Sequence, residues 1–359
     1  MARKTGKELE ELKKKYGVSE IWSWSRFSCY KTSPFEFYLK YILKEPEDNE
    51  PSIYGVFGGL VHEIIERFYL GEIKYEDMIK EYEDVLFELQ VQGLKYNKVD
   101  EEANLKIGNK YEKCVEHFFR NHKPFKEKMY IEKFVDIKVG KYLFQSYLDA
   151  VCKIGDKVHI LDWKTSTEYT GDKALKEIGQ LKLYAYGLWK KGVKAEDIVY
   201  GWVFVKYYTF KFKQKNGKFK SMNIERIIDP MEVKTIKSNI LGKLEEFGYN
   251  KDEFIDYKFE ELPENIKSEY EVSDCMTLFN STEQELEDFA KEVEKNVDEI
   301  CDRIKKYYDS GEDEEVWMGE KIDGKNLYYM NNLSGYSFRK HKPFGEYIEN
   351  SRMFMNDED

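Results

Sequence analysis

An aspartate and a lysine two residues apart, Asp162 and Lys164, end an apolar run of this chain. In an extended strand, residues i and i+2 lie on the same side, so we expect the carboxylate and the ammonium to be neighbours. The carboxylate and the backbone carbonyl of Trp163 would offer oxygen ligands to a hard divalent cation. The lysine would then stabilise negative charge that develops on a nearby phosphate. Taken alone, such a pair is more often a surface ion pair.

Two other residues add candidate ligands. Asp149 lies in an apolar segment, and a turn at Gly155 would bring it close to Asp162. Two carboxylates in apolar surroundings repel each other and need a cation to stay ionised. His62, on a predicted helix, would supply an imidazole, and a nitrogen ligand makes manganese more acceptable than it would be at an all-oxygen site. The alternatives are a solvent-facing aspartate and a histidine that only packs.

Gln180 and Tyr184 are four residues apart on another predicted helix. Residues at this spacing share a helix face. A side-chain amide and a phenol on one face can hold a phosphate or steady Lys164. For a lone pair of this kind, ordinary helix polarity is the more common explanation.

The elements that must position these residues follow from the hydrophobic pattern. Apolar residues at helical spacing predict a helix over 60–69, which carries His62, and another over 173–190. β-branched and aromatic residues, interrupted by glycine turns, predict strands over 130–139, 142–153, 158–164 and 199–206. The order α-β-β-β-α-β predicts an α/β fold with a central mixed β-sheet flanked by helices. Further helices are predicted at both ends of the chain.

A basic hairpin is predicted after the last of these strands, over 206–220, with Asn216-Gly217 at its tip. It holds six lysines and no acidic residue, and aromatic residues alternate with the lysines. Such a hairpin could follow phosphates and stack unpaired bases, or its lysines could simply protect a sheet edge. The candidate nucleic-acid contacts are Lys206, Tyr208, Phe210, Lys211 and Lys213.

Composition limits the classes of protein to consider. The chain has 359 residues and a net charge of -11, but fourteen acidic and five basic residues between 283 and 315 account for most of it. The remainder is near neutral and could present a basic surface. The five cysteines are scattered without C-x-x-C spacing, which argues against a disulfide framework or a structural zinc site. With no secretory signal and no long apolar run, we expect a cytoplasmic protein without a membrane partner.

The candidate residues also occur in a recognisable order. A helical G-x-x-x-H ends at His62, Glu132 lies on the first strand, and Asp149 ends the second. D-x-K at Asp162 and Q-x-x-x-Y at Gln180 follow. In this order the sequence resembles the RecB-like branch of the PD-(D/E)XK nuclease superfamily, over about residues 20 to 206. That branch includes CRISPR-associated and phage exonucleases.

The resemblance implies a restriction-endonuclease-like core and a role for each motif residue. The expected ligands of Mg²⁺ or Mn²⁺ are His62, Asp149, Asp162 and the Trp163 carbonyl. The expected catalytic and supporting residues are Asp149, Asp162, Lys164, Gln180, Tyr184 and Glu132. Among them Lys164 would be the catalytic lysine, whereas Gln180 and Tyr184 would contact the DNA backbone or support the site. Residues 1–225 would form the nuclease core with an N-terminal helical segment, and 226–359 a mainly helical region packed on it.

The sequence departs from many relatives at one feature. These relatives bind an iron–sulfur cluster through a Cys-Pro near the N-terminus and three cysteines near the C-terminus. Ser33-Pro34 stands at the first position here, and residues 331–347 contain no cysteine. We therefore predict that no cluster is bound.

The function that the resemblance implies is metal-dependent hydrolysis of DNA. The expected activity is that of an exonuclease on single strands or duplex ends, in recombination, repair or phage DNA processing. A structure-specific endonuclease and a non-cleaving DNA-binding scaffold with the same fold remain as alternatives. The expected partners are DNA and possible recombination or replication proteins, in the cytoplasm of a bacterium or a phage-infected host. Digestion polarity and oligomeric state stay open.

Overall fold

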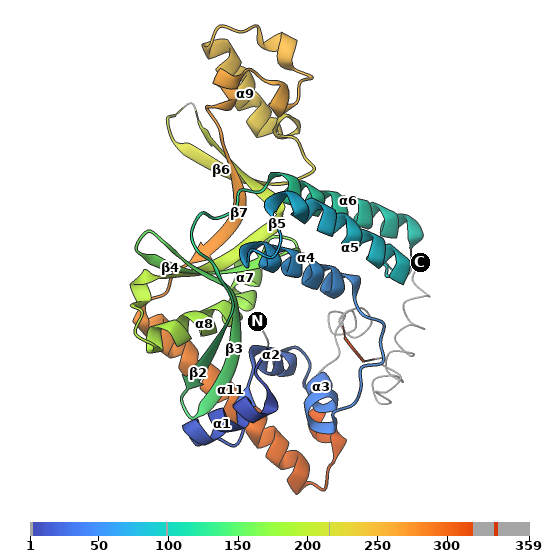
Figure 1. Ribbon diagram of the computed structural model, residues 1–359, viewed down its shortest axis with the longest axis vertical. Helices are drawn as coiled ribbons and strands as arrows, with labels where there is room; N and C mark the ends of the chain where they lie inside the picture. The colour runs from blue at the N-terminus through green and yellow to red at the C-terminus, as the bar shows by residue number, and fades with distance from the viewer. Residues whose placement is uncertain (1–2, 98–99, 215, 319–333, 337–359) are drawn as a thin grey trace.

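The computed structural model describes residues 3–97, 100–214, 216–318 and 334–336 and shows a mixed α/β fold (Figure 1). The described residues form a seven-stranded sheet with the order β1-β3-β4-β5-β6, in which β2 also pairs with β3 and β7 with β5. The strands are β1 (Ile21–Trp22), β2 (Tyr130–Val139), β3 (Tyr142–Ile154), β4 (Lys157–Lys164), β5 (Ile198–Lys213), β6 (Phe219–Glu225) and β7 (Glu271–Phe279). Antiparallel β3–β4 and parallel β4–β5 pairs make the sheet mixed, as predicted.

Helices precede, interrupt and follow the sheet. The α-helices are α1 (Gly6–Tyr16), α2 (Trp24–Thr32), α3 (Pro34–Phe37), α4 (Ile53–Tyr69), α5 (Met78–Gln92), α6 (Glu101–Asn121), α7 (Gly171–Glu177), α8 (Gly179–Lys190), α9 (Lys234–Glu246), α10 (Glu264–Lys267) and α11 (Glu283–Asp309). Shorter turns are the π-helical η1 (Tyr38–Leu43) and the 3-10 segments η2 (Tyr75–Asp77), η3 (Ala195–Asp197), η4 (Pro230–Glu232), η5 (Lys251–Phe254), η6 (Phe259–Glu261) and η7 (Glu314–Trp317). None of the helices in these described ranges is long and apolar enough to cross a lipid bilayer.

Two apolar cores lie on the two faces of the sheet. Helices α8 and α11 cover one face, and α4, α5 and α6 cover the other (Figure 1). Along β4, Ile160 packs in the core beneath α8, whereas Leu161 and Trp163 pack in the core beneath α4. Because side chains alternate along a strand, Asp162 and Lys164 belong to the α8 face.

Beyond the central sheet, β5, β6 and β7 continue as an arm that carries α9 and α10 (Figure 1). The arm has a third apolar core, in which Phe210 and Phe212 of β5 pack with Ile236 and Ile240 of α9. The hairpin expected over 206–220 is the outer end of β5 and β6. The chain then returns to the sheet through β7, so the region after residue 225 contributes a strand as well as helices. Residues 319–333 and 337–359, which include most of the cysteine-free segment 331–347, lie outside the described residues.

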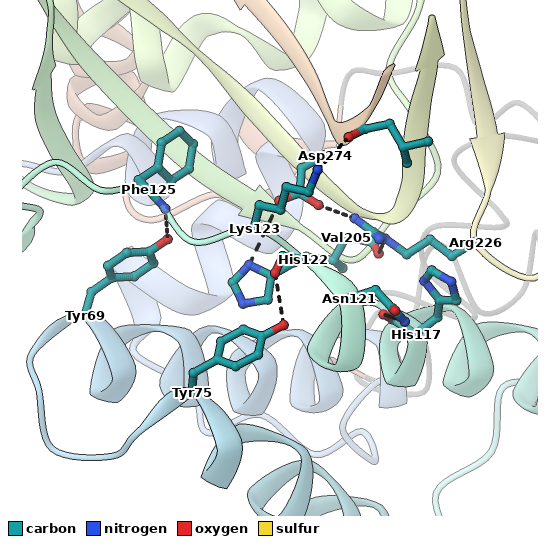
Figure 2. Close-up of polar contacts among 11 residues, drawn as sticks. Tyr69, Tyr75, His117, Asn121, His122, Lys123, Phe125, Val205, Arg226 and Asp274 are labelled. Carbon is teal, nitrogen blue, oxygen red and sulfur yellow. Dashed lines mark hydrogen bonds and ion pairs between the residues drawn. The ribbon is translucent and has the colours of Figure 1, made fainter. Parts of the chain in front are cut away.

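The arm leaves the sheet at an irregularity of β5 that a buried ion pair holds in place (Figure 2). The pairing of β5 with β7 shifts register between Phe204 and Tyr208. Arg226, only 5% exposed, donates from Nε to the Val205 carbonyl at 2.9 Å and from Nη2 to Asp274 Oδ1. The guanidinium therefore satisfies a carbonyl that the shifted ladder leaves unpaired.

We expect Arg226→Ala to lower the free energy of unfolding by about 3–5 kcal/mol, because Asp274, whose side chain is only 12% exposed, would lose its cation. Urea unfolding followed by circular dichroism would measure the change. Lys251→Ala is the control, since it breaks an exposed ion pair with Glu245 on the same arm and should leave the free energy of unfolding nearly unchanged. Equal losses for the two variants would contradict a structural role for the buried pair.

Candidate metal centre

The pairing of β3 with β4 brings two acids to one point. The antiparallel ladder ends at the pair Ala150 and Leu161, and in the same register the next opposed residues are Asp149 and Asp162. His62 of α4 reaches the place where the strands separate. His62, Asp149 and Asp162 each offer one ligand atom, and these atoms all lie within 4.8 Å of one another.

A close approach between α4 and the end of β4 explains the position of His62. One helical turn before it, a Cβ on Gly58 would come within 3.3 Å of the Thr165 hydroxyl, so a glycine lets the helix approach the strand. The His62 Nε2 atom contacts the carbonyl oxygen of Trp163 and lies 3.8 Å from Asp162 Oδ1. The imidazole and the carbonyl thus face the same point as the acids.

Asp162 has an oxygen that other protein groups leave unsatisfied. Its side chain is buried, and Oδ2 lies 2.6 Å from the Lys164 ammonium. The other oxygen, Oδ1, accepts no hydrogen bond from the described residues. A buried, unpaired carboxylate oxygen is costly, and a cation would remove that cost. Two carboxylates, an imidazole and a carbonyl are a donor set that fits Mg²⁺ or Mn²⁺.

The electrostatic surroundings agree with this fit. Burial, and then the charge of Asp162, raise the pKa of Asp149 well above its usual range. Burial lowers the pKa of His62, so its imidazole is neutral, as a ligand must be. Burial alone would lower the pKa of Lys164, but the charges of Asp162 and Asp149 outweigh it, and the net shift is upward. The lysine therefore stays charged.

The raised pKa of Asp149 predicts that cation binding releases a proton. A carboxyl whose pKa is raised holds its proton to higher pH, and a cation must displace that proton before it can bind. We expect Mn²⁺ affinity to rise with pH and about one proton to be released per site. Titration calorimetry in two buffers of different ionisation enthalpy would measure the release. Asp149→Asn should bind more weakly and without buffer dependence, and buffer-independent heats in the unchanged protein would contradict the prediction.

Helix α8 brings Gln180 and Tyr184 to the same face as Asp162. Gln180 Nε2 donates to the Tyr184 hydroxyl at 2.6 Å, and Tyr184 is 3% exposed. Burial and the nearby charge of Asp149 raise the pKa of Tyr184, so its phenol keeps its proton. Since this hydroxyl accepts from Gln180, its own hydrogen is available to another acceptor.

Glu132 lies opposite Asp149 and has a strained backbone. Its φ of 49° is in the left-handed region, which costs a residue other than glycine about 1–3 kcal/mol. The strand changes face here, since Ile131 packs in the core beneath α4 and Val135 in the core beneath α8. Burial, and then the charge of Glu132, raise the pKa of Glu66 to about 7.

The lysines of the hairpin and its rings Tyr208 and Phe210 lie in different surroundings. Lys206 lies over the Tyr111 ring at 4.6 Å, and Lys211 pairs with Glu271 at 2.9 Å. Tyr208 and Phe210 are 6% and 0% exposed and pack in the arm core. The expectation that these two rings stack on bases needs correction, because they cover the apolar side of the arm. The exposed ring is instead Phe219, another of the aromatic residues that alternate with the lysines of this hairpin.

The chain matches a known protein family over most of its length. A family model described as the PD-(D/E)XK nuclease superfamily matches residues 21–313. No protein of curated function matches the chain. One solved structure, "Crystal structure of SSO0001", is 14% identical, covers 57% of this chain and 82% of its own, and superposes with a TM-score of 0.16. Because the family model matches most of this chain, the chain belongs to the PD-(D/E)XK nuclease superfamily.

Proposed function

We propose that the protein is a deoxyribonuclease of the RecB-like branch that requires Mg²⁺ or Mn²⁺. The observation that carries the proposal is the convergence of His62, Asp149 and Asp162 around an unsatisfied carboxylate oxygen, beside a charged lysine. Membership of the superfamily supports a metal-dependent nuclease. The RecB-like assignment rests on the order of motifs from His62 to Tyr184.

Each residue would have a distinct role in hydrolysis. The ion would be held by the His62 imidazole, the two carboxylates and the Trp163 carbonyl. When bound, such a cation polarises a phosphodiester and makes water a stronger nucleophile. Lys164 places a positive charge where negative charge develops on phosphorus. The Tyr184 hydroxyl, oriented by Gln180, donates its hydrogen to a phosphate oxygen, and Glu132 supports the ligands through Asp149.

The finer assignment is an exonuclease on single strands or duplex ends, in recombination, repair or phage DNA processing in a bacterial or phage-infected cytoplasm. Lys206, Lys211 and Lys213 would contact the DNA backbone. Recombination or replication proteins would be the protein partners. We also propose that no iron–sulfur cluster is bound. In support, Ser33 caps α3 by accepting from the Glu36 N–H at 3.2 Å, and it offers no thiolate.

Labelled oligonucleotides and a closed circular plasmid, incubated with Mg²⁺, Mn²⁺ or EDTA, test the proposal. A ladder that shortens from one labelled end is the expected result. Nicked circles would replace the exonuclease by an endonuclease. DNA that is retained but not cut with either metal would overturn the enzyme and leave a DNA-binding scaffold.

A further inference from the structure

The outward face of the arm carries polar, basic and aromatic side chains from β5 and β6. Tyr208, Phe210 and Phe212 alternate with this row and point into the arm core. Opposed residues of an antiparallel pair share a face, so the outward row forms three cross-strand pairs. These pairs, which we name the arm platform, are Thr209–Asn223, Lys211–Ser221 and Lys213–Phe219.

Because of the irregularity of β5, the platform lies on the same face of the sheet as Asp162 and Lys164, which we call the catalytic face. Trp202 and Phe204 pair with Asp162 and Lys164 and share their face. In a regular strand the even-numbered residues would continue that face. Instead Tyr207 packs against the core that contains Phe204, so the odd-numbered row follows the catalytic face beyond the register shift.

Figure 2 shows the hydrogen bonds of Arg226 that hold the irregularity of β5. Arg226 bonds both Asp274 and the carbonyl of Val205, inside the shifted segment of β5. The Arg226 N–H also donates to the Lys206 carbonyl at 2.9 Å. Three hydrogen bonds from one buried residue therefore hold the shift.

The platform is also tied to the loop that follows Lys164. Asn223 Nδ2 donates to Glu168 Oε1 at 2.6 Å, and the Thr209 hydroxyl donates to Asn223 Oδ1 at 2.8 Å. Glu168 lies four residues after Lys164 in the chain. A ligand that follows the platform inward therefore arrives at the loop next to the catalytic lysine.

The charge of the platform suits phosphates. Of its acidic neighbours, Glu271 forms an ion pair with Lys211 and Glu225 with Lys110, whereas Glu168 accepts from the neutral amide of Asn223 and keeps its charge. Lys213 and Lys218 form no ion pair within the described part of the chain, and both are free to contact a polyanion.

The exposed ring of Phe219 favours single-stranded over double-stranded nucleic acid. Its side chain is 67% exposed, and the Lys211 ammonium lies 5.3 Å from its ring. An exposed ring beside lysines can stack on a base, but only on one whose face is free. Bases in a duplex are covered on both faces by their neighbours, so the ring selects an unpaired strand.

We propose that the arm platform binds a single DNA strand and leads it to the metal centre. This rests on the proposed nuclease function and names the single strand as the substrate of that same site. From Thr209 to Lys213 the platform is about 13 Å long at about 3.3 Å per residue. An unpaired strand that crosses it would lay a few nucleotides on it, near the lower end of the about 4–16 nucleotides that single-strand binding folds cover.

Binding in EDTA tests the platform separately from catalysis. Fluorescence anisotropy with a labelled oligothymidine of about 20 nucleotides should show affinity about tenfold weaker for Phe219→Ala. Lys213→Ala should reduce the slope of log affinity against log salt by about 0.7. The matched control is Phe247→Ala, which removes an exposed ring from the end of α9 and should leave affinity unchanged.

Cleavage of an oligonucleotide of about three nucleotides, too short to reach Phe219 even when extended, should be equal in Phe219→Ala and the unchanged protein. Failure of the unchanged protein to cut any DNA would overturn the nuclease, whereas the binding result in EDTA would still stand. If Phe219→Ala and Lys213→Ala both bind the long strand normally, or if duplex competes as well as single strand, the platform proposal is wrong. The exposed ring would then mark a protein contact.

Discussion

Asp162→Asn is expected to slow DNA cleavage by at least about 10³-fold while the protein stays folded. The substitution keeps the shape of the side chain but removes the charge that would hold a cation between β3 and β4. It also removes the repulsion between Asp162 and Asp149, and Lys164 keeps the nearby charge of Asp149 as a partner, so folding should not suffer. Single-turnover cleavage of labelled DNA at saturating Mn²⁺ would measure the rate, and calorimetry the affinity for the ion.

The matched control is Asp156→Asn, the same substitution at an exposed turn residue between the same two strands. It should leave both the rate and the Mn²⁺ affinity unchanged. A rate for Asp162→Asn within tenfold of the unchanged protein would show that this carboxylate is not a ligand of the catalytic ion.

Lys164→Met is expected to lower the cleavage rate by about 10²–10³-fold and to leave Mn²⁺ binding intact or stronger. The ammonium lies 2.6 Å from Asp162 Oδ2 and competes with a cation for that carboxylate. Removing the ammonium frees an Asp162 oxygen for the metal. The negative charge that develops on the phosphate then lacks the lysine that would stabilise it. Loss of rate without loss of affinity separates the lysine from the ligands.

Lys157→Met serves as its control, because Lys157 is an exposed lysine at the start of the same strand. Both variants should unfold at similar denaturant concentrations to the unchanged protein. Loss of Mn²⁺ binding in Lys164→Met would contradict the division of roles and would make the lysine a structural part of the metal centre.

Local features of the sequence were enough to predict part of the site. The turn at Gly155 fixes how β3 pairs with β4, and this short-range register opposes Asp149 and Asp162. The spacing of Gln180 and Tyr184 on one helix is equally local, and the two side chains are hydrogen-bonded to each other. In both cases a strand or helix period determines the geometry.

His62 could be predicted from motif order but not from physics, because its position depends on how closely α4 approaches β4. Gly58, which lies against Thr165 more than a hundred residues away in the chain, makes room for that approach. The left-handed backbone conformation of Glu132 could not be predicted from the sequence either, because glutamate has no preference for a positive φ.

The arm shows a different limit of sequence reasoning. Alternation along 206–213 predicts an amphipathic strand, but the register shift and the later helix α9 decide which row is buried. The shift depends on Arg226, in the turn that follows β6, and on Asp274 of β7. Strand β7 was not predicted, since the residues around Asp274 lie mostly at a half-exposed edge and show little apolar alternation.

A crystal structure of the protein soaked with Mn²⁺ tests the central claim most directly. We predict one ion, identified by its anomalous signal, about 2.1–2.3 Å from His62 Nε2, a carboxylate oxygen of Asp149, Asp162 Oδ1 and the Trp163 carbonyl. An ion bound elsewhere, or no ion at these three side chains at a concentration that supports cleavage, would contradict the assignment of this site.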